Sequence, residues 1–223
     1  MQIIITGISQ GLGEELFNLL SKKNVKIVAL SRRFLDNQYL LEKSKNNIQL
    51  CMVDLSNITD VEKVLDELSL EDDIIFINNA SKITPIDSIQ NISNDDLVNS
   101  ITTNFITPAL IVKKLSNKKS LFIINLSTGA SKRAIQNWSL YCSTKAGIEM
   151  FFNVIADDEH KNIEVVNFDP GVMNTNMQQQ IRNSKFNDVD VFKSYKSKNI
   201  LKDTKDVAFE IYERYIKEKI INE

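Results

Sequence analysis

The segment TGISQGLGEEL, residues 6–16, decides the predicted fold of this chain. It follows a short β-branched run at 3–6 and leads into leucines spaced as in a helix. Gly7, Gly11 and Gly13 allow a tight turn and a close approach of the backbone to a ligand, and the N–H groups that open the helix attract an anion. The spacing G-x-x-x-G-x-G also fits an ordinary turn between strand and helix. Because half of the chain's six glycines lie here, we favour a dinucleotide phosphate site.

Segments typical of strands and of helices alternate along the whole chain. The predicted strands are short and almost continuously apolar, as expected where both faces of a parallel sheet are covered. This alternation predicts a doubly wound α/β fold, with one domain spanning residues 1–223. The strands are expected at 3–6, 25–30, 48–53, 73–78, 120–125 and 163–168.

The predicted helices follow the spacing of apolar side chains between these strands. A long helix should begin after Ser93, its expected cap, and run to about Lys114, with a kink at Pro108. The segment 174–204 is polar and has little periodicity, and an insertion of this length after a strand is more often a substrate lid than disorder. We therefore expect a lid there. Further helices are expected at 12–20, at 61–68 after a cap at Asn57 or Thr59, at 141–157 and at 205–219.

The composition argues against several classes of protein. The net charge is −2 and the isoelectric point about 5.6, so neither nucleic acid nor an anionic membrane is an expected partner. No apolar run approaches the roughly 20 residues of a membrane helix, and MQIIIT does not resemble a signal peptide. Cys51 and Cys142 are expected to be unpaired thiols in a reducing, cytoplasmic compartment. His160, the single histidine, is expected at a solvated helix end, so we predict no metal centre and no Ser-His-Asp system.

The end of the second predicted strand indicates which dinucleotide binds. An NAD site places Asp or Glu there to bind the ribose 2′-hydroxyl, whereas an NADP site avoids the carboxylate and supplies a cation. This chain has Ser31, followed by Arg32 and Arg33. A planar guanidinium suits the additional phosphate, although two solvated arginines remain the alternative, and Gln10 supplies no further cation. The pattern predicts NADP(H).

Tyr141 and Lys145 lie four residues apart on a predicted helix and therefore on the same face. A phenol with a pKa near 10 is too weak an acid for efficient proton transfer at neutral pH. A nearby ammonium favours the phenolate, and so does the positive charge of an oxidised nicotinamide. A Tyr and a Lys often meet on a helix by chance, but this pair accompanies the glycine loop. We therefore interpret the pair as a phenol whose pKa a neighbouring ammonium lowers.

Six motifs resemble, in order, those of the short-chain dehydrogenase/reductase superfamily, and in particular its sepiapterin reductase-like branch. The resemblance covers almost the whole chain and implies an NADPH-dependent carbonyl reductase. It also implies an apolar ketone or 1,2-diketone such as benzil as substrate. The motifs are TGISQGLG (6–13), NNAS (78–81), Asn104, NLST (125–128), YCSTK (141–145) and DPGVMNT (169–175).

The resemblance also implies catalytic roles. Tyr141 would protonate the carbonyl oxygen, and Lys145 would lower the pKa of Tyr141 and bind the nicotinamide ribose. Thr128, thirteen residues before the tyrosine, stands where serine is usual and would hold the carbonyl. Ser127 is the alternative, although its side chain should point to the opposite face of an extended segment. Asn104 would hold a water that links Lys145 to solvent, or would mark only a local helix distortion.

Other positions match cofactor and substrate contacts of the family. Asp54 would contact the adenine amino group, and Ser81 replaces the usual glycine of NNAG, which should tighten that turn. Trp138, Met173 and Met177 are expected to wall an apolar substrate pocket, with core packing as the alternative for the methionines. The expected cofactor contacts are Gly7, Ser9, Gln10, Gly11, Leu12, Gly13, Ser31, Arg32, Arg33, Asp54, Leu55, Asn79, Ala80, Ser81, Asn104, Tyr141, Lys145, Pro170, Gly171, Val172 and Thr175.

The C-terminal sequence departs from the family pattern. Members usually finish with a further strand, and here ERYIKEKIINE leaves an abbreviated strand or none. We therefore expect a homodimer or a monomer rather than the usual tetramer. Two other functions stay open: a reductase or dehydrogenase of another small metabolite, and a dinucleotide-binding sensor without turnover.

Overall fold

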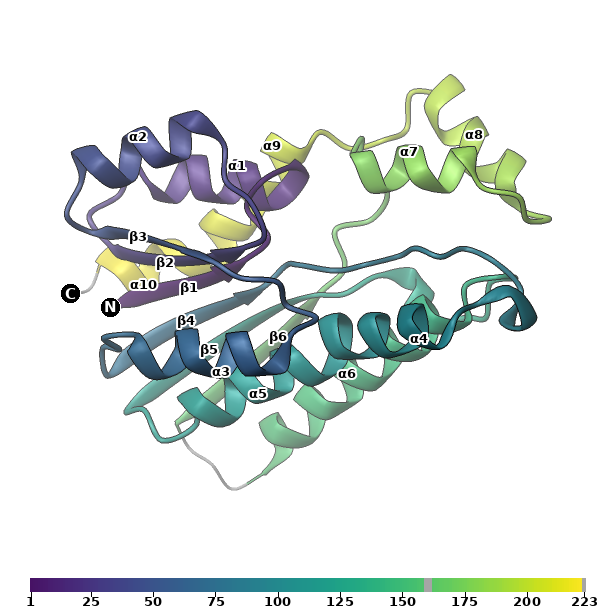
Figure 1. The fold of residues 1–223 in the computed structure, drawn as a ribbon. Coiled ribbons are helices and arrows are strands. Elements are labelled where there is room, and N and C mark those ends of the chain that lie inside the picture. Colours follow the sequence, from purple (N-terminus) through teal and green to yellow (C-terminus); the bar gives the residue numbers. More distant parts are fainter. Residues whose placement is uncertain (159–161, 222–223) are drawn as a thin grey trace.

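A parallel six-stranded sheet of order β3-β2-β1-β4-β5-β6 forms the centre of the computed structural model (Figure 1). The structure describes residues 1–158 and 162–221, so the expectation for His160 lies outside the described residues. Every neighbouring pair of strands is parallel, which confirms the doubly wound fold. The strands are β1 (Gln2–Thr6), β2 (Lys26–Ser31), β3 (Ile48–Met52), β4 (Asp73–Asn78), β5 (Ser120–Leu126) and β6 (Ile163–Phe168).

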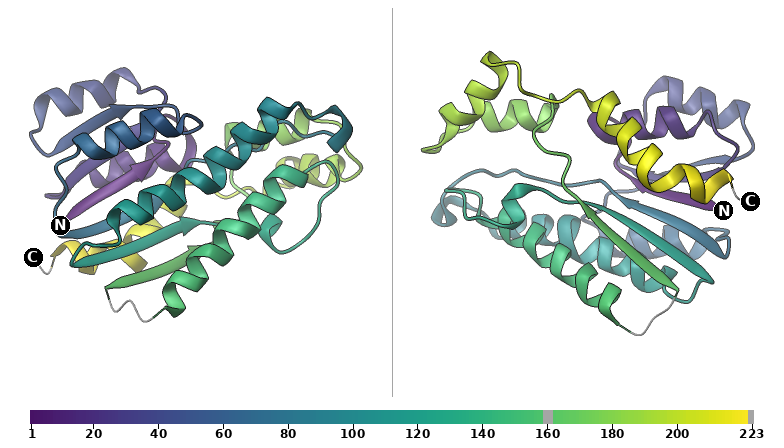
Figure 2. Two further views of the ribbon diagram at one scale, coloured as in Figure 1. Left: turned by 60° about the horizontal axis from the view of Figure 1, so that its bottom comes forward. Right: turned by 180° about the vertical axis from the view of Figure 1, so that it is seen from behind.

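Helices cover both faces of this sheet (Figures 1 and 2). The first face carries α1 (Gly11–Leu20), α2 (Asp36–Ser44), α9 (Thr204–Ile211) and α10 (Lys217–Ile221). The second face carries α3 (Ile58–Glu67), α5 (Thr107–Leu115) and α6 (Ser139–Asp157).

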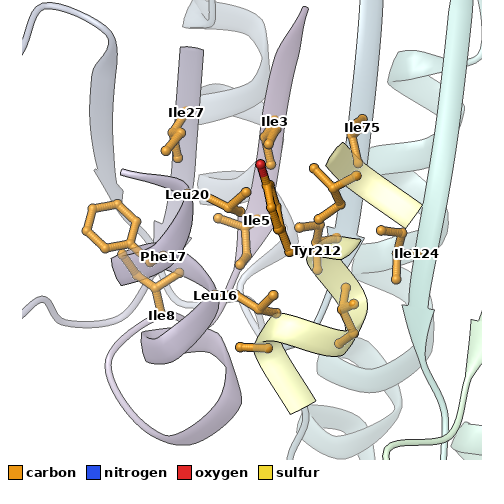
Figure 3. Packing of buried hydrophobic residues seen from close by; sticks show 14 of the residues in the cluster. Ile3, Ile5, Ile8, Leu16, Phe17, Leu20, Ile27, Ile75, Ile124 and Tyr212 are labelled. Carbon is orange, nitrogen blue, oxygen red and sulfur yellow. The ribbon is translucent and has the colours of Figure 1, made fainter. Parts of the chain in front are cut away.

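The core consists of two apolar layers, one on each face of the sheet. Successive side chains of a strand point to opposite faces, so Ile3 and Ile5 join one cluster and Ile4 joins the other. Tyr212, from the C-terminal helical segment, packs among the isoleucines of the first layer (Figure 3). Because both faces are covered, β1 is buried at each of its five positions. This burial explains why the strands are almost continuously apolar.

The strand order places a crevice at the carboxyl ends of β1 and β4. The chain leaves β1 toward β2 on one side, whereas β4 and β5 follow on the other side. In such sheets the loops part at this switch point and a ligand binds between them. The glycine loop after β1 and the NNAS segment after β4 therefore face the same space.

The long helix predicted from Ser93 to Lys114 contains a π-helical turn. The Ser93 hydroxyl accepts a hydrogen bond from the backbone N–H of Asp96 and caps α4 (Asn94–Ile101), as predicted. The π-helical turn Thr102–Ile106 then joins α4 to α5. The irregularity thus lies one turn before Pro108, which lacks the N–H that an ordinary residue would donate to the preceding turn.

Two regions hold helices that the sequence did not predict. The first region lies between β2 and β3 and holds α2. The second is the segment 174–204, which contains α7 (Asn176–Asn183) and α8 (Val189–Ser197). These two helices lie beyond the carboxyl ends of the strands (Figure 2).

The C-terminal segment is helical as predicted, from Thr204 to Ile221, with a π-helical turn at Tyr212–Ile216. Among the described residues no seventh strand joins the sheet. In the same part of the chain, no helix combines the length and the apolarity needed to cross a membrane.

Candidate functional site

A cavity of about 910 Å³ runs along the carboxyl ends of the strands. Its lining includes the glycine loop, the ends of β2, β4 and β5, the start of α6, and α7 and α8. All but two of the predicted site residues line it. The exceptions are Gly13, buried beneath the glycine loop, and Asn104, buried in the π-helical turn. The fold therefore gathers residues that are up to 170 positions apart in sequence, from Gly7 to Met177.

The glycine loop has the geometry of a phosphate cradle. Gly7 and Gly11 have φ angles of +74° and +62°, which residues with a side chain rarely adopt. A Cβ atom on Gly13 would lie 2.1 Å from the carbonyl oxygen of Gly7, so this position has room only for hydrogen. The Asn79 amide holds the turn from β4, because its Nδ2 donates to the carbonyls of Thr6 (2.9 Å) and Gly7 (2.8 Å). The loop fits a pyrophosphate on the start of α1.

The end of β2 presents two cations to the cavity. Arg32 and Arg33 are exposed, and within residues 1–158 and 162–221 neither guanidinium forms a hydrogen bond or an ion pair with a protein group. Asp54 lies opposite. Burial alone would raise the pKa of its carboxyl, but hydrogen bonds from Ser56 and the charges of Arg32 and Lys82 lower that pKa overall. The Asp54 carboxyl is therefore favoured in its ionised form, and the two guanidinium groups face the cavity.

The Asn104 side chain holds the segment that follows β4 through hydrogen bonds. Its Oδ1 accepts hydrogen bonds from the Lys82 backbone N–H (2.7 Å) and the Ser81 hydroxyl (3.1 Å). Its Nδ2 donates to the Lys82 carbonyl (2.8 Å) and to the Thr144 hydroxyl on α6 (3.1 Å). The helix distortion that the sequence left open is present, because Asn104 sits in the π-helical turn. The link from Lys145 to solvent through a water stays a prediction. Pro108 has no N–H for the Asn104 carbonyl, which an ordinary residue four positions later would supply.

Thr128 and Ser127 point in different directions. Thr128 lies close enough to the Tyr141 phenol for its hydroxyl to favour the phenolate. The Ser127 hydroxyl instead donates to the Glu149 carboxylate on α6, which also accepts from Ser131 at 2.6 Å. Alternation along an extended segment produces this divergence, as expected from the sequence. Of the two hydroxyls, the structure brings that of Thr128 to Tyr141.

Tyr141 is buried at the start of α6, with a 7% exposed side chain. Burial raises the pKa of its phenol to about 12, the charge of Asp169 adds to the rise, and the hydroxyls of Ser81 and Thr128 oppose it. The expected lowering of this pKa is therefore absent when only the protein's own groups act. The phenol hydroxyl donates weakly to the Met177 sulfur at 3.8 Å. Tyr141 is held neutral, which is the form that can give up a proton.

Lys145 lies one helical turn after Tyr141 and is fully buried. Its Nζ donates to the Leu126 carbonyl at the end of β5 over 2.7 Å. Burial lowers the pKa of Lys145 to about 8, although the carboxylate of Glu149 opposes this effect. The ammonium is thus fixed at the floor of the cavity. It titrates much nearer to neutral pH than an exposed lysine does.

An aromatic cluster closes the other end of the cavity. Trp138 packs edge-on against Tyr141 and Phe186, with ring centroids 5.9 Å and 5.7 Å apart, and against Phe192 at 5.3 Å. Met177 borders this cluster, whereas Met173 packs against the first core layer and also lines the cavity. The sequence did not predict that Phe186, Phe192 and Tyr195 belong to the site. The only available signal was the presence of three aromatic residues within the polar segment 174–204.

Comparison with known proteins supports one family. Residues 1–185 match the family model described as short chain dehydrogenase. A benzil reductase ((S)-benzoin forming) of Bacillus cereus is 32% identical over 197 residues, covering 81% of this chain and 78% of the relative. The protein of the same description from Bacillus subtilis (strain 168) is 33% identical over 195 residues, with the same two coverages.

Solved structures agree on the fold. The crystal structure of the KRED1-Pglu enzyme is 23% identical and superposes with a TM-score of 0.81, covering 99% of this chain and 98% of that chain. These matches do not single out the sepiapterin reductase-like branch, which stays a prediction. The family model alone covers most of the chain, with the glycine loop, Asn104, Tyr141 and Lys145 inside the matched residues. The chain therefore belongs to the short-chain dehydrogenase/reductase family, whose members are oxidoreductases of alcohol and carbonyl groups.

Proposed function

We propose that this protein is an NADPH-dependent reductase of apolar ketones or 1,2-diketones, with benzil as the model substrate. One observation carries the proposal. The cavity joins a phosphate cradle and two exposed arginines at one end to a buried Tyr141 and an aromatic wall at the other. The relatives described as benzil reductases support the same substrate class.

In this proposal, bound NADPH supplies the hydride that reduces the carbonyl carbon. Thr128 donates a hydrogen bond to the carbonyl oxygen and polarises it, and Tyr141 delivers the proton to the same oxygen. Lys145 provides positive charge below the phenol and a donor for the cofactor's ribose. Asn104 holds the floor of the site through Lys82 and Thr144. The residues thus perform general acid catalysis, positioning and charge stabilisation.

The two arginines support NADPH over NADH. A 2′-phosphate placed at the end of β2 would meet guanidinium groups that form no hydrogen bond or ion pair with the residues that the structure describes. Charge-assisted contacts of this kind contribute about 1.5–3 kcal/mol each. Arg32→Ala should therefore raise the Kd of NADPH about tenfold or more and leave that of NADH almost unchanged. Equal weakening of both cofactors would refute the assignment of Arg32.

The aromatic cluster supports an apolar substrate, and α7 and α8 support a lid over it. Trp138 is the N-cap residue just before α6, whereas Phe186 and Phe192 come from the segment 174–204. Flat, apolar rings offer stacking surface to an aryl ketone. Phe192→Ala should raise the KM of benzil more than that of a small aliphatic diketone such as butane-2,3-dione.

The experiment that tests the function follows the loss of NADPH absorbance with benzil and with smaller 1,2-diketones. NADH runs in parallel, and Tyr141→Phe is the matched control, because it removes one hydroxyl and keeps the ring. Turnover that depends on Tyr141 supports the reductase. Tight NADPH binding without turnover of any carbonyl would favour a dinucleotide sensor instead. Turnover restricted to other carbonyl metabolites would refute the substrate class alone.

We further propose a homodimer in a reducing compartment such as the cytoplasm. Cys51 and Cys142 are free thiols, which suits that compartment. On α6 the side chains of Met150 and Val154 are 62% and 54% exposed, which provides an apolar surface for a second copy. Light scattering of the wild type and of Val154→Glu decides between the dimer and a monomer.

A further inference from the structure

Glu149 holds both ends of the turn that carries Thr128. This carboxylate stands on α6, and its side chain is 16% exposed. Its Oε2 accepts a hydrogen bond from the Ser127 hydroxyl and another from the Ser131 hydroxyl, the latter at 2.6 Å. Ser127 lies just before Thr128, and Ser131 ends the short helical turn Gly129–Ser131 that follows it. One acceptor on α6 therefore fixes the backbone on either side of Thr128.

The turn in its own right orients the Thr128 hydroxyl. Thr128 Oγ1 accepts a hydrogen bond from the Ala130 backbone N–H at 3.3 Å. A threonine hydroxyl has one proton besides its two lone pairs, so it can donate to a second partner while it accepts from Ala130. Thr128 lines the cavity, where that partner can be a substrate oxygen. The direction of the Thr128 proton thus depends on where the turn places Ala130.

The serine hydroxyls are the contacts that tie this turn to α6. The Ser131 hydroxyl also lies 2.8 Å from the Thr128 carbonyl, but that carbonyl already accepts from the Ser131 backbone N–H at 3.0 Å. A serine has one proton, and the charged carboxylate is the stronger acceptor, so we assign this proton to Glu149. Lys132 Nζ comes within 3.9 Å of Glu149 Oε1, but the lysine side chain is 73% exposed. An ion pair this exposed adds little to the tether.

We propose that Glu149 is a positioning residue that fixes the Thr128 hydroxyl for the substrate carbonyl. This inference rests on the proposed reductase function. Lys145, one helical turn before Glu149, holds the Leu126 carbonyl through its Nζ, so two side chains of α6 support the segment 126–131. The same helix carries Tyr141, and the carbonyl donor and the acid therefore share one support. A misplacement of about 1 Å can cost a large part of the rate, which makes such a support matter for turnover.

A small set of variants separates the tether from its surroundings. Glu149→Leu removes the acceptor and keeps a side chain of similar size. Glu149→Gln keeps an oxygen that can accept from both hydroxyls and serves as the rescue variant. Lys132→Met removes the exposed cation beside the same carboxylate and is the matched control. If Glu149→Leu does not fold, Ser127→Ala combined with Ser131→Ala removes the same two hydrogen bonds from the other side and takes its place.

The first experiment observes Thr128 directly and needs no turnover. Methyl-labelled threonine gives an NMR signal for each threonine, and Thr128→Ser identifies that of residue 128. We expect Glu149→Leu to shift and broaden this signal, because the turn is no longer tied to α6. Glu149→Gln and Lys132→Met should leave it close to its wild-type position. An unchanged Thr128 signal in Glu149→Leu, or the same change in Glu149→Gln as in Glu149→Leu, would overturn the proposal.

The second experiment measures kcat for benzil and the Kd of NADPH. Glu149→Leu should lower kcat about tenfold or more. The Kd of NADPH should stay near that of the wild type, because Glu149 is not among the described residues that line the cavity. Lys132→Met should keep both values. A wild-type kcat in Glu149→Leu, or a loss of NADPH affinity as large as the loss of kcat, argues against the positioning role. If the wild type itself turns over no carbonyl, the reductase function fails, whereas the methyl spectra still decide whether Glu149 holds Thr128.

Discussion

Replacing Gly13 by alanine is the sharpest test of the phosphate cradle. The added Cβ would lie 2.1 Å from the Gly7 carbonyl oxygen and 2.4 Å from Asn79 Nδ2. Neither neighbouring atom can move freely. The Gly7 oxygen belongs to the backbone, and the Asn79 side-chain amide donates hydrogen bonds to two carbonyls. Overpacking of this kind costs about 1–3 kcal/mol or more, and each disturbed hydrogen bond costs about 1 kcal/mol. Alanine regains about 1 kcal/mol through its helix propensity, so we expect a net loss of about 3 kcal/mol.

A second glycine of a helix provides the matched control. A Cβ on Gly147, in α6, would lie 3.4 Å from the Phe105 ring, which is an ordinary contact. Gly147→Ala should therefore stabilise the protein by up to about 1 kcal/mol. For a chain of this length, Gly13→Ala should lower Tm by about 6–12 °C, and Gly147→Ala should raise it slightly.

Thermal unfolding of both variants, with and without NADPH, is the assay. We expect NADPH to raise the Tm of the wild type and of Gly147→Ala but not that of Gly13→Ala, because a ligand stabilises only the state that binds it. If Gly13→Ala unfolds at the same temperature as the wild type, or above it, the reasoning from the close approach of Gly7 and Gly13 is wrong.

Three further predictions concern charge, capping and thiols. The folded-state pKa of Lys145, about 8, lies below its unfolded value of 10.5, so between these pH values only the unfolded chain holds the proton. Relative to Lys145→Met, the wild type should gain about 3 kcal/mol of unfolding free energy as pH rises through this window, and a constant difference in urea denaturation would contradict the assignment. Asn57→Ala should cost about 1 kcal/mol by removing the cap of α3, whereas Thr59→Ala, one position inside the helix, should cost almost nothing in the same assay. Burial raises the pKa of Cys51 to about 11 and also raises that of Cys142. Both thiols should therefore react with an aromatic disulfide more slowly in the folded protein than in urea. Equal reaction rates would argue against the burial of these thiols.

Local sequence patterns were sufficient for the sheet, and they located the glycine loop that lines the cavity. Each predicted strand agrees with the structure to within one residue at either end, since burial on both faces leaves a continuous apolar run. The glycine loop is contiguous in sequence, and Gly7 and Gly11 have positive φ angles that glycine adopts most readily. A tight turn with positive φ angles is a local requirement, so the spacing of the glycines indicates it directly.

The helix α2 shows where the patterns fail. Its buried residue is the polar Gln38, whose Nε2 donates to the Ile8 carbonyl at 2.7 Å, and its Leu40 is 65% exposed. An apolar period cannot reveal a helix that is held by a buried amide. In the segment 174–204, Phe186, Phe192 and Tyr195 lie on α8 and the turn before it, so they share no single helical period.

The sequence by itself determined the class of fold, and it predicted the phosphate loop and the Tyr141–Lys145 pair, because each leaves a pattern among residues that are close in sequence. Only the tertiary structure decided how the site is assembled. It turned Thr128 toward Tyr141 and Ser127 toward Glu149, joined Ser81 to Asn104 across 23 positions, and set the aromatic side chains of α8 against Trp138. These contacts unite strands, helices and loops that are far apart along the chain. Their geometry follows from the packing of whole elements, for which no local pattern carries a signal.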